Sequence, residues 1–133
     1  MRLLLDTHVW LWMIGQSSRL GDETRSVLTD EASDLYLSTV AAWEIGIKHA
    51  AGRLKFTGKP SVQPPGYVKR SGVQPLDVTL DHALRAAELP MHHRDPFDRL
   101  MIAQAQEEEL TFVTADSRLA AYDVPILQPG AGA

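Results

Sequence analysis

The chain has 133 residues and no cysteine, 44% of its residues are hydrophobic, and its formal net charge is −4. This length fits one domain with a core of its own, and the absence of cysteine excludes disulfides and thiolate metal sites. The acidic balance argues against a protein that binds nucleic acid by phosphate neutralisation alone, so such a partner would need help from divalent cations.

Short apolar runs alternate with stretches of helical periodicity along the first half of the chain. This is the pattern of strands joined by helices. In chain order the predicted elements are a strand over 2–5, a helix over 7–14, a polar helix from Asp22, a strand over 35–37 and a helix over 40–50 capped by Ser38.

The second half starts with loop signals and then repeats the alternation. The predicted elements are loops at 55–59 and 64–66, a brief helix over 66–71, strands over 73–76, 111–113 and 124–127, and helices over 80–88 and from Pro96 to about Glu109. We expect one α/β domain over residues 1–129 and a flexible tail over 130–133. A parallel sheet of four or five strands should carry helices on both faces, with its ligand site beyond the carboxyl ends of the strands.

Two aspartates follow predicted strands directly. Asp6 comes after the first apolar run, and Asp116 comes three residues after Val113. Both should therefore lie at the carboxyl edge of the sheet. Each could also be only a helix N-cap, a role that contributes about 1 kcal/mol.

Glu44 is the only charged residue in an apolar helical stretch over 40–47. A buried carboxylate without a partner is costly. The structural alternative is an ion pair with Lys48 four residues later, and the functional and structural interpretations are equally weighted.

Two further carboxylates stand at the start of the helix that begins near Pro96. Proline favours the first helical position, which makes Asp95 the expected N-cap and places Asp98 in the first turn. Four carboxylates, from Asp6, Glu44, Asp98 and Asp116, would then face one site without a matching set of basic residues. Such clustering is costly unless a hard divalent cation such as Mg²⁺ or Mn²⁺ is shared.

Taken together, four segments resemble the PIN-domain ribonucleases, and specifically the VapC-type toxins of type II toxin–antitoxin systems. The segments are Leu3-Leu4-Leu5-Asp6-Thr7-His8, Trp43-Glu44-Ile45-Gly46-Ile47-Lys48 with Gly52-Arg53-Leu54, residues 93–99, and Leu110-Thr111-Phe112-Val113-Thr114-Ala115-Asp116.

This resemblance implies a PIN-like three-layer α/β/α fold and an acidic pocket that matches Asp6, Glu44, Asp98 and Asp116. It also implies metal-assisted cleavage of RNA phosphodiester bonds by an activated water, a cognate antitoxin and a homodimer. Thr114 and Asp95 are second-tier site residues, with Thr114 near the metal-bound waters by comparison with the family.

Arg94 and Arg99 are candidates for contact with RNA phosphate, because a guanidinium fits phosphate geometry, although surface salt bridges are an equal alternative. The adjacent His92 and His93 are interpreted as exposed polar residues rather than ligands. Trp10, Trp12 and Trp43 are expected in the core or in an interface.

Two other functions remain open. A haloacid-dehalogenase-like phosphatase also has an aspartate after its first strand, but the second aspartate expected two positions later is His8 here. The second is a non-catalytic acidic module that binds a basic partner. Because Asp6 and His8 interrupt the N-terminal apolar run, neither a signal peptide nor a membrane association is expected, and the predicted location is cytoplasmic.

Overall fold

The structure is a computed structural model that describes residues 1–15, 17–54 and 63–130. Its strands are β1 (Arg2–Leu5), β2 (Asp34–Ser38), β3 (Gln74–Leu76), β4 (Thr111–Val113) and β5 (Ile126–Leu127). Its helices are α1 (Thr7–Ile14), α2 (Asp22–Thr29), α3 (Thr39–Ala50), α4 (Gln63–Ser71), α5 (Leu80–Glu88), α6 (Pro96–Glu107) and the 3₁₀ helix η1 (Ser117–Ala121).

All five strands pair in parallel, in the order β3-β2-β1-β4-β5. The chain builds the sheet outward from β1 through β2 to β3, and then returns to the other side of β1 with β4 and β5. The strand order therefore reverses between β1 and β4, which is where open parallel sheets bind their ligands. The backbone N–H of Asp6 donates to the carbonyl of Val113 across this point, at 2.9 Å.

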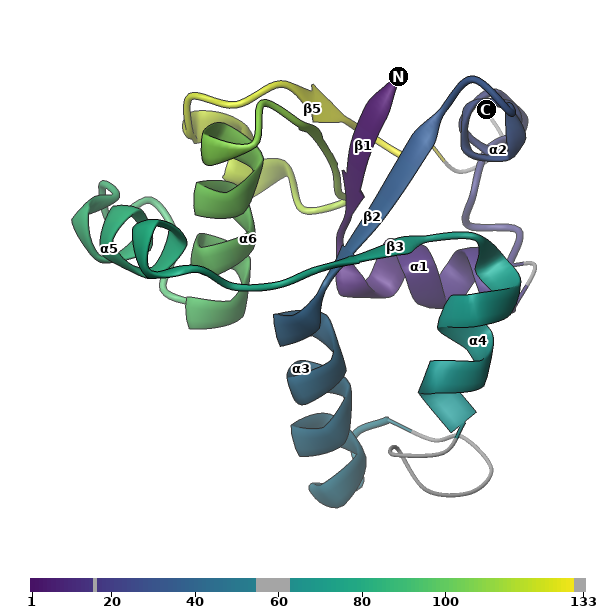
Figure 1. The fold of residues 1–133 in the computed structure, drawn as a ribbon, viewed down its shortest axis with the longest axis horizontal. Coiled ribbons are helices and arrows are strands. Elements are labelled where there is room, and N and C mark those ends of the chain that lie inside the picture. Colours follow the sequence, from purple (N-terminus) through teal and green to yellow (C-terminus); the bar gives the residue numbers. More distant parts are fainter. Residues whose placement is uncertain (16, 55–62, 131–133) are drawn as a thin grey trace.

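Helices cover both faces of the sheet, with α1, α2 and α4 on one side and α5, α6 and η1 on the other (Figure 1). Residues of β1 alternate between two cores, because successive side chains of a strand point to opposite faces. Leu3 and Leu5 pack with the first group of helices, and Leu4 packs with α6. The expected three-layer α/β/α fold is confirmed, and the parallel sheet, predicted with four or five strands, has five.

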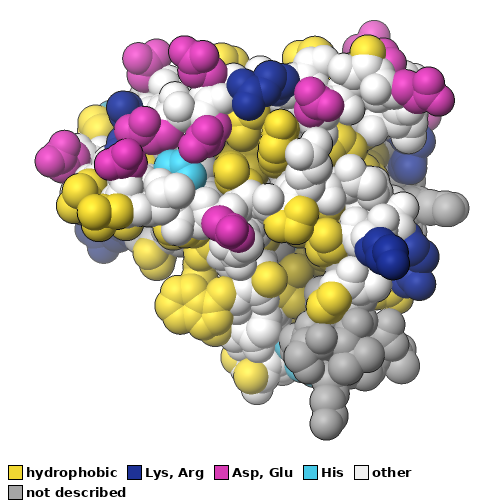
Figure 2. All heavy atoms as spheres, in the orientation of Figure 1, with side chains coloured by type: hydrophobic (Ala, Val, Ile, Leu, Met, Phe, Trp, Pro, Cys, Tyr) yellow, Lys and Arg dark blue, Asp and Glu magenta, His cyan; other side chains and the backbone are white. Residues whose placement is uncertain are grey.

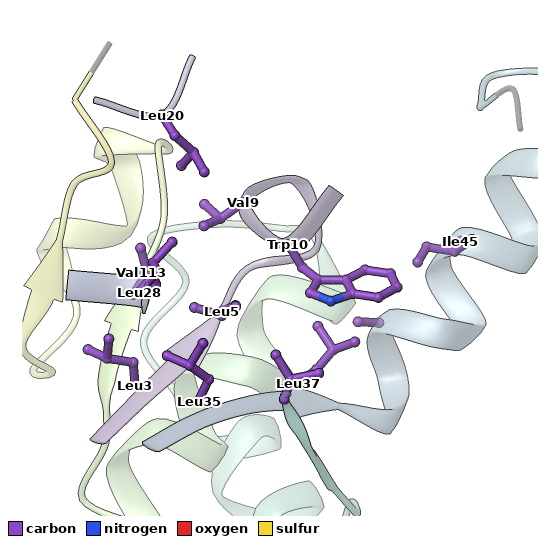
Figure 3. Packing of buried hydrophobic residues seen from close by; sticks show 12 residues of the cluster. Leu3, Leu5, Val9, Trp10, Leu20, Leu28, Leu35, Leu37, Ile45 and Val113 are labelled. Carbon is purple, nitrogen blue, oxygen red and sulfur yellow. The ribbon is translucent and has the colours of Figure 1, made fainter. Parts of the chain in front are cut away.

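Trp10 is the largest side chain of the first core and is 1% exposed. Its indole reaches from α1 toward Ile45 on α3 (Figure 3), and its Nε1–H donates to Ser71 Oγ at 3.1 Å. The prediction of a core position is confirmed for Trp10. Trp43 is instead 65% exposed and stands edge-on to the ring of Phe97.

The loop predicted at residues 64–66 is wrong, because α4 begins at Gln63 and includes them. The two prolines are the second and third residues of that helix. First-turn N–H groups have no partner within a helix, so proline costs little there. The loop predicted at 55–59 and the end of the predicted tail, residues 131–133, lie outside the described residues. Within the described residues, no helix is both long and apolar enough to cross a membrane.

Candidate functional site

Asp6 leaves β1 at the point where the strand order reverses. It occupies the N-cap position of α1, but its carboxylate makes no capping hydrogen bond. Instead its Oδ2 accepts a hydrogen bond from the buried hydroxyl of Thr114, at 2.7 Å. Burial raises the pKa of Asp6, and the nearby Glu44 carboxylate raises it further, whereas the Thr114 hydroxyl lowers it. The capping interpretation is therefore wrong for Asp6.

Thr114 connects the two aspartates that follow β1 and β4. Its hydroxyl donates to Asp6 and also accepts the backbone N–H of Asp116, at 3.1 Å. The residue is completely buried. One side chain thereby fixes the carboxylate of the first strand relative to the backbone that follows the fourth.

Glu44 lies on α3, just beyond the end of β2, and its side chain is 3% exposed. Oε1 accepts the hydroxyl of Thr7 at 2.6 Å, and Oε2 pairs with Nζ of Lys48 at 2.5 Å. The ion pair considered as the structural alternative is thus present. Glu44 still contributes negative charge to the site, because it raises the pKa of both Asp6 and Asp98.

Asp98 is placed by the N-terminus of α6, as the sequence predicts. Asp95 caps this helix by accepting the N–H groups of Phe97 and Asp98, at 2.8 and 3.3 Å. Within the described residues the Asp98 carboxylate accepts no hydrogen bond, and its nearest basic nitrogen is His93 Nε2 at 3.6 Å. Burial raises the pKa of Asp98 to about 8, with further contributions from Asp6, Asp95, Glu44 and Asp116.

Asp116 has the opposite environment. Its carboxylate caps η1 and forms a two-point ion pair with Arg118, with Nε–Oδ1 and Nη2–Oδ2 distances of 3.0 and 2.8 Å. These contacts, together with a hydrogen bond from His93, lower the pKa of Asp116 to about 2. The capping interpretation is therefore correct for Asp116. Its carboxylate also lies beside that of Asp98.

His93 belongs to this site, although the sequence interpretation dismissed it as exposed. Its side chain is only 8% exposed, and Nε2 lies 3.0 Å from Asp116 Oδ2. The backbone N–H of Asp95 donates to Nδ1, so a neutral imidazole carries its proton on Nε2 and donates to Asp116. His93, Asp98 and Asp116 offer ligand atoms within 4.8 Å of one another. In the tautomer that the contacts define, His93 orients Asp116 rather than offering a free lone pair.

The two arginines predicted to contact phosphate differ in the structure. Arg94 is exposed. Arg99 is only 8% exposed and donates to the backbone carbonyls of Ala86, Leu89 and Pro90, at 2.9 to 3.1 Å. Its guanidinium is therefore committed to holding the turn between α5 and α6, which argues against a phosphate contact for Arg99.

Acidity alone does not mark the site. Acidic side chains also gather over α5 and the end of α6, on the upper left of the face shown in Figure 2. There Glu107 pairs with Arg85 and Glu108 accepts from His82, and both glutamates are more exposed than Asp98. What distinguishes the group at the sheet edge is burial together with mutual repulsion.

The donor set fits a hard divalent cation. The ligand atoms that lie within 4.8 Å of one another are those of His93, Asp98 and Asp116, and Asp6 and Glu44 are not in that group. Asp6, Glu44 and Asp116 each raise the pKa of Asp98 by charge repulsion, so all four carboxylates act on one region at the carboxyl edge of the sheet. Oxygen-only sets of this kind suit Mg²⁺ or Mn²⁺. A cation shared by Asp6 and Asp98 would offset the burial, and the weaker carboxylate repulsion, that raise their pKa values.

Comparison with known proteins agrees with this arrangement. A family model described as the PIN domain matches residues 3–125. The chain therefore belongs to the PIN-domain family, as the resemblance in its sequence predicted.

Ribonuclease VapC16 of Mycobacterium tuberculosis (strain ATCC 25618 / H37Rv) is 36% identical to this chain over 62 residues. The matched segment covers 47% of this chain and 43% of that relative, which is less than half the length of each.

Solved structures show the same fold along nearly the whole chain. A chain of VapBC2 from Rickettsia felis, bound to a DNA fragment from its promoter, has a TM-score of 0.72 at 14% identity and covers 96% of this chain and 98% of its own. DNA-bound VapBC from Salmonella typhimurium has a TM-score of 0.70 at 15% identity with the same coverage. VapBC-5 from Mycobacterium tuberculosis has 0.60 at 21%, covering 97% and 98%.

Proposed function

We propose that this protein is a VapC-type endoribonuclease that uses Mg²⁺ or Mn²⁺ and acts as the toxin of a toxin–antitoxin pair. The observation that carries the proposal is Asp98, a largely buried carboxylate among other carboxylates, for which the described residues provide no Lys or Arg partner and whose nearest basic nitrogen is His93 Nε2 at 3.6 Å. Membership of the PIN-domain family and the match to a ribonuclease support the substrate class.

In this proposal Asp6, Glu44, Asp98 and Asp116 hold the cation. When bound, the cation would supply charge to activate water and to stabilise the phosphodiester oxygens. Thr114 fixes the orientation of Asp6, Asp95 fixes the start of α6, and His93 donates a hydrogen bond to Asp116. Arg94 remains a candidate for contact with RNA phosphate because it is exposed.

A cognate antitoxin, a homodimer and a cytoplasmic site of action complete the proposal. Support for an antitoxin comes from the structural relatives, whose descriptions name VapBC assemblies and a toxin–antitoxin complex. None of these partners changes the chemistry assigned to the acidic residues.

The test is cleavage of a pool of cellular RNA by the purified protein, with Mn²⁺ or Mg²⁺ added and the new RNA ends sequenced. We expect cleavage by the wild type and a loss of at least about 100-fold in the Asp6→Asn and Asp98→Asn variants, since even residues that only orient metal ligands contribute 10- to 100-fold. Asp123→Asn is the matched control, because it removes the same charge from an exposed position next to the start of β5, at the opposite edge of the sheet.

Two results would contradict the proposal. Absence of cation-dependent cleavage by folded wild-type protein at micromolar concentration would favour the acidic binding module. Formation of a phospho-aspartate at Asp6 with a phosphate ester would favour the phosphatase.

A further inference from the structure

The carboxylate of Asp116 is the most heavily bonded member of the acidic group. It accepts four hydrogen bonds, from the backbone N–H, Nε and Nη2 of Arg118 and from His93 Nε2, all between 2.8 and 3.0 Å. Both oxygens are therefore occupied in the structure. A cation that used Asp116 as a ligand would have to share or replace some of these donors.

Asp6 and Asp98 differ from Asp116 in this respect. Asp6 accepts one side-chain hydrogen bond, from Thr114, and the described residues provide none for Asp98. Within the described residues, Asp6 and Asp98 have no Lys or Arg partner, whereas Asp116 is paired with Arg118 and Glu44 with Lys48. The acidic group is therefore divided between two carboxylates without such a partner and two that each hold a basic side chain.

Arg118 is held by no other part of the protein that the structure describes. Its side chain is 70% exposed, and each side-chain contact found for it within the described residues ends on Asp116. Arg99 is buried among backbone carbonyls, and Lys48 is 25% exposed and paired with the buried Glu44. Among the described basic residues paired with the acidic group, Arg118 is the one whose charged group can move without unpacking the core.

A guanidinium keeps its charge at ordinary pH, so after it leaves one anion it can still bind another. Its planar fork fits two carboxylate oxygens and fits two phosphate oxygens in the same way. Arg118 is the second residue of η1, the helix capped by Asp116, at the edge of the sheet where a phosphodiester would approach the carboxylates.

We propose that Arg118 exchanges partners: it competes with the divalent cation for Asp116 in the resting protein, and it binds an RNA phosphate once the cation has taken Asp116. This inference rests on the proposed function, because the phosphate partner is the substrate named there. Arg118 is a substrate-positioning residue that was not recognised in the sequence, in which only Arg94 and Arg99 were considered.

The first test measures Mn²⁺ binding by calorimetry and needs no RNA. Arg118→Gln should bind Mn²⁺ about two- to fivefold more tightly than the wild type, which is the range set by exposed ion pairs. Arg85→Gln is the matched control, since it removes the same charge and breaks an exposed pair with Glu107 on α5 and α6. The control should change Mn²⁺ affinity by less than half as much, and Asp98→Asn should weaken binding.

The second test measures steady-state cleavage of the RNA fragment whose cut site the cleavage assay maps. Arg118→Gln should raise KM about tenfold at saturating Mn²⁺ and change kcat less than threefold, because loss of a uniform substrate contact acts on KM. Arg118→Lys keeps the positive charge but not the planar two-point geometry of a guanidinium. Its KM should therefore lie between those of the wild type and Arg118→Gln. If Arg118 were needed only for folding, its variants would lower the active fraction and kcat, and KM would not increase in the order wild type, Arg118→Lys, Arg118→Gln.

The outcomes separate this inference from the proposed function. Equal Mn²⁺ affinity in wild type, Arg118→Gln and Arg85→Gln would overturn the competition while leaving the ribonuclease intact. A KM unaffected by Arg118→Gln would overturn the phosphate contact. Failure of the wild type to cleave RNA would remove the proposed function and the phosphate partner with it, whatever the Mn²⁺ titration shows.

Discussion

Asp98 and Asp116 show how two carboxylates beside the same imidazole acquire opposite acidities. Both lie within 3.6 Å of His93 Nε2, yet the pKa of Asp98 is about 8 and that of Asp116 is about 2. Asp98 is buried among other anions, whereas Asp116 receives the guanidinium of Arg118. The difference comes from the neighbours and not from the residue type.

The stability of the cation-free protein should therefore depend on pH through Asp98. Its folded pKa of about 8 lies above the ordinary value of 3.8, so the folded protein retains a proton that the unfolded chain releases. Its stabilising contribution is complete below about pH 4 and is lost as the pH rises through 8. Asp116 has the opposite sign, with a contribution that is complete above about pH 4 and is lost only as the pH falls toward 2.

Asp98→Asn should remove this dependence. In the presence of a chelator, we expect the variant to be more stable than the wild type by about 1–3 kcal/mol at pH 8 and nearly equal to it at pH 4. Urea unfolding at the two pH values measures the difference, with Asp123→Asn as the control. A variant that is less stable than the wild type at pH 8 would show that Asp98 has a structural partner.

Site residues at strand and helix ends were predictable, because the local rules that place them act over a few residues. Asp6 follows an apolar run, and Asp95-Pro96 marks a helix start. Contacts across the chain were not predictable in this way. His93 meets Asp116 from 23 positions away, and Arg99 is buried by carbonyls of a turn that only the packing of α5 on α6 brings to it.

At the scale of elements, the strands and helices follow local signals except where backbone geometry overrides composition. The prolines of α4 occupy positions that tolerate them, so they do not mark a loop. The 3₁₀ helix η1 was not among the predicted elements, although a helix N-cap was one of the two interpretations of Asp116. In the first case proline occurs in the first turn of a helix as well as in loops, and in the second an aspartate is both a helix cap and a site residue. The sequence alone does not separate these roles.

The end of α6 offers a test of backbone strain. Glu109 follows the helix with a φ of 55°, a conformation that glycine adopts more easily than other residues, and its side chain is exposed. Glu109→Gly should raise the free energy of unfolding by about 0.5–1 kcal/mol. At the end of α3, Gly52 has a φ of 73° with open space around it, so Gly52→Ala should lower the free energy of unfolding by about 1 kcal/mol. Thermal unfolding measures both, and shifts of the same sign would contradict the explanation.

At the scale of the whole molecule, the order of strands in the sheet brings residues that are far apart in the sequence to one site. The parallel pairing of β1 with β2 on one side and with β4 on the other brings the ends of these three strands to one edge. The alternation of strands and helices was sufficient to predict a parallel sheet. It did not define which strand lies next to β1, because several orders satisfy the same alternation.

Cation binding should stabilise this fold in a pH-dependent way. A ligand that binds only the folded state raises the unfolding temperature, and a proton on Asp98 competes with the cation. With a pKa of about 8, apparent Mn²⁺ affinity should be roughly 20-fold weaker at pH 6 than at pH 7.5. The rise in Tm with added Mn²⁺ should accordingly be larger at pH 7.5, and equal rises at both pH values would contradict a role for Asp98 in binding.

The hydroxyl of Thr114 reaches Asp6 across 108 positions of sequence, and β4 completes the sheet beside β1 late in the chain. During synthesis, a ribosome that has released only the first hundred residues therefore carries Asp6, Glu44 and Asp98 without the strand that orients them. The carboxylate of Asp6 acquires its Thr114 partner only after β4 has been synthesised. Under the proposed function, the unfinished chain would not yet cleave RNA, and the length of that interval would be set by the topology alone.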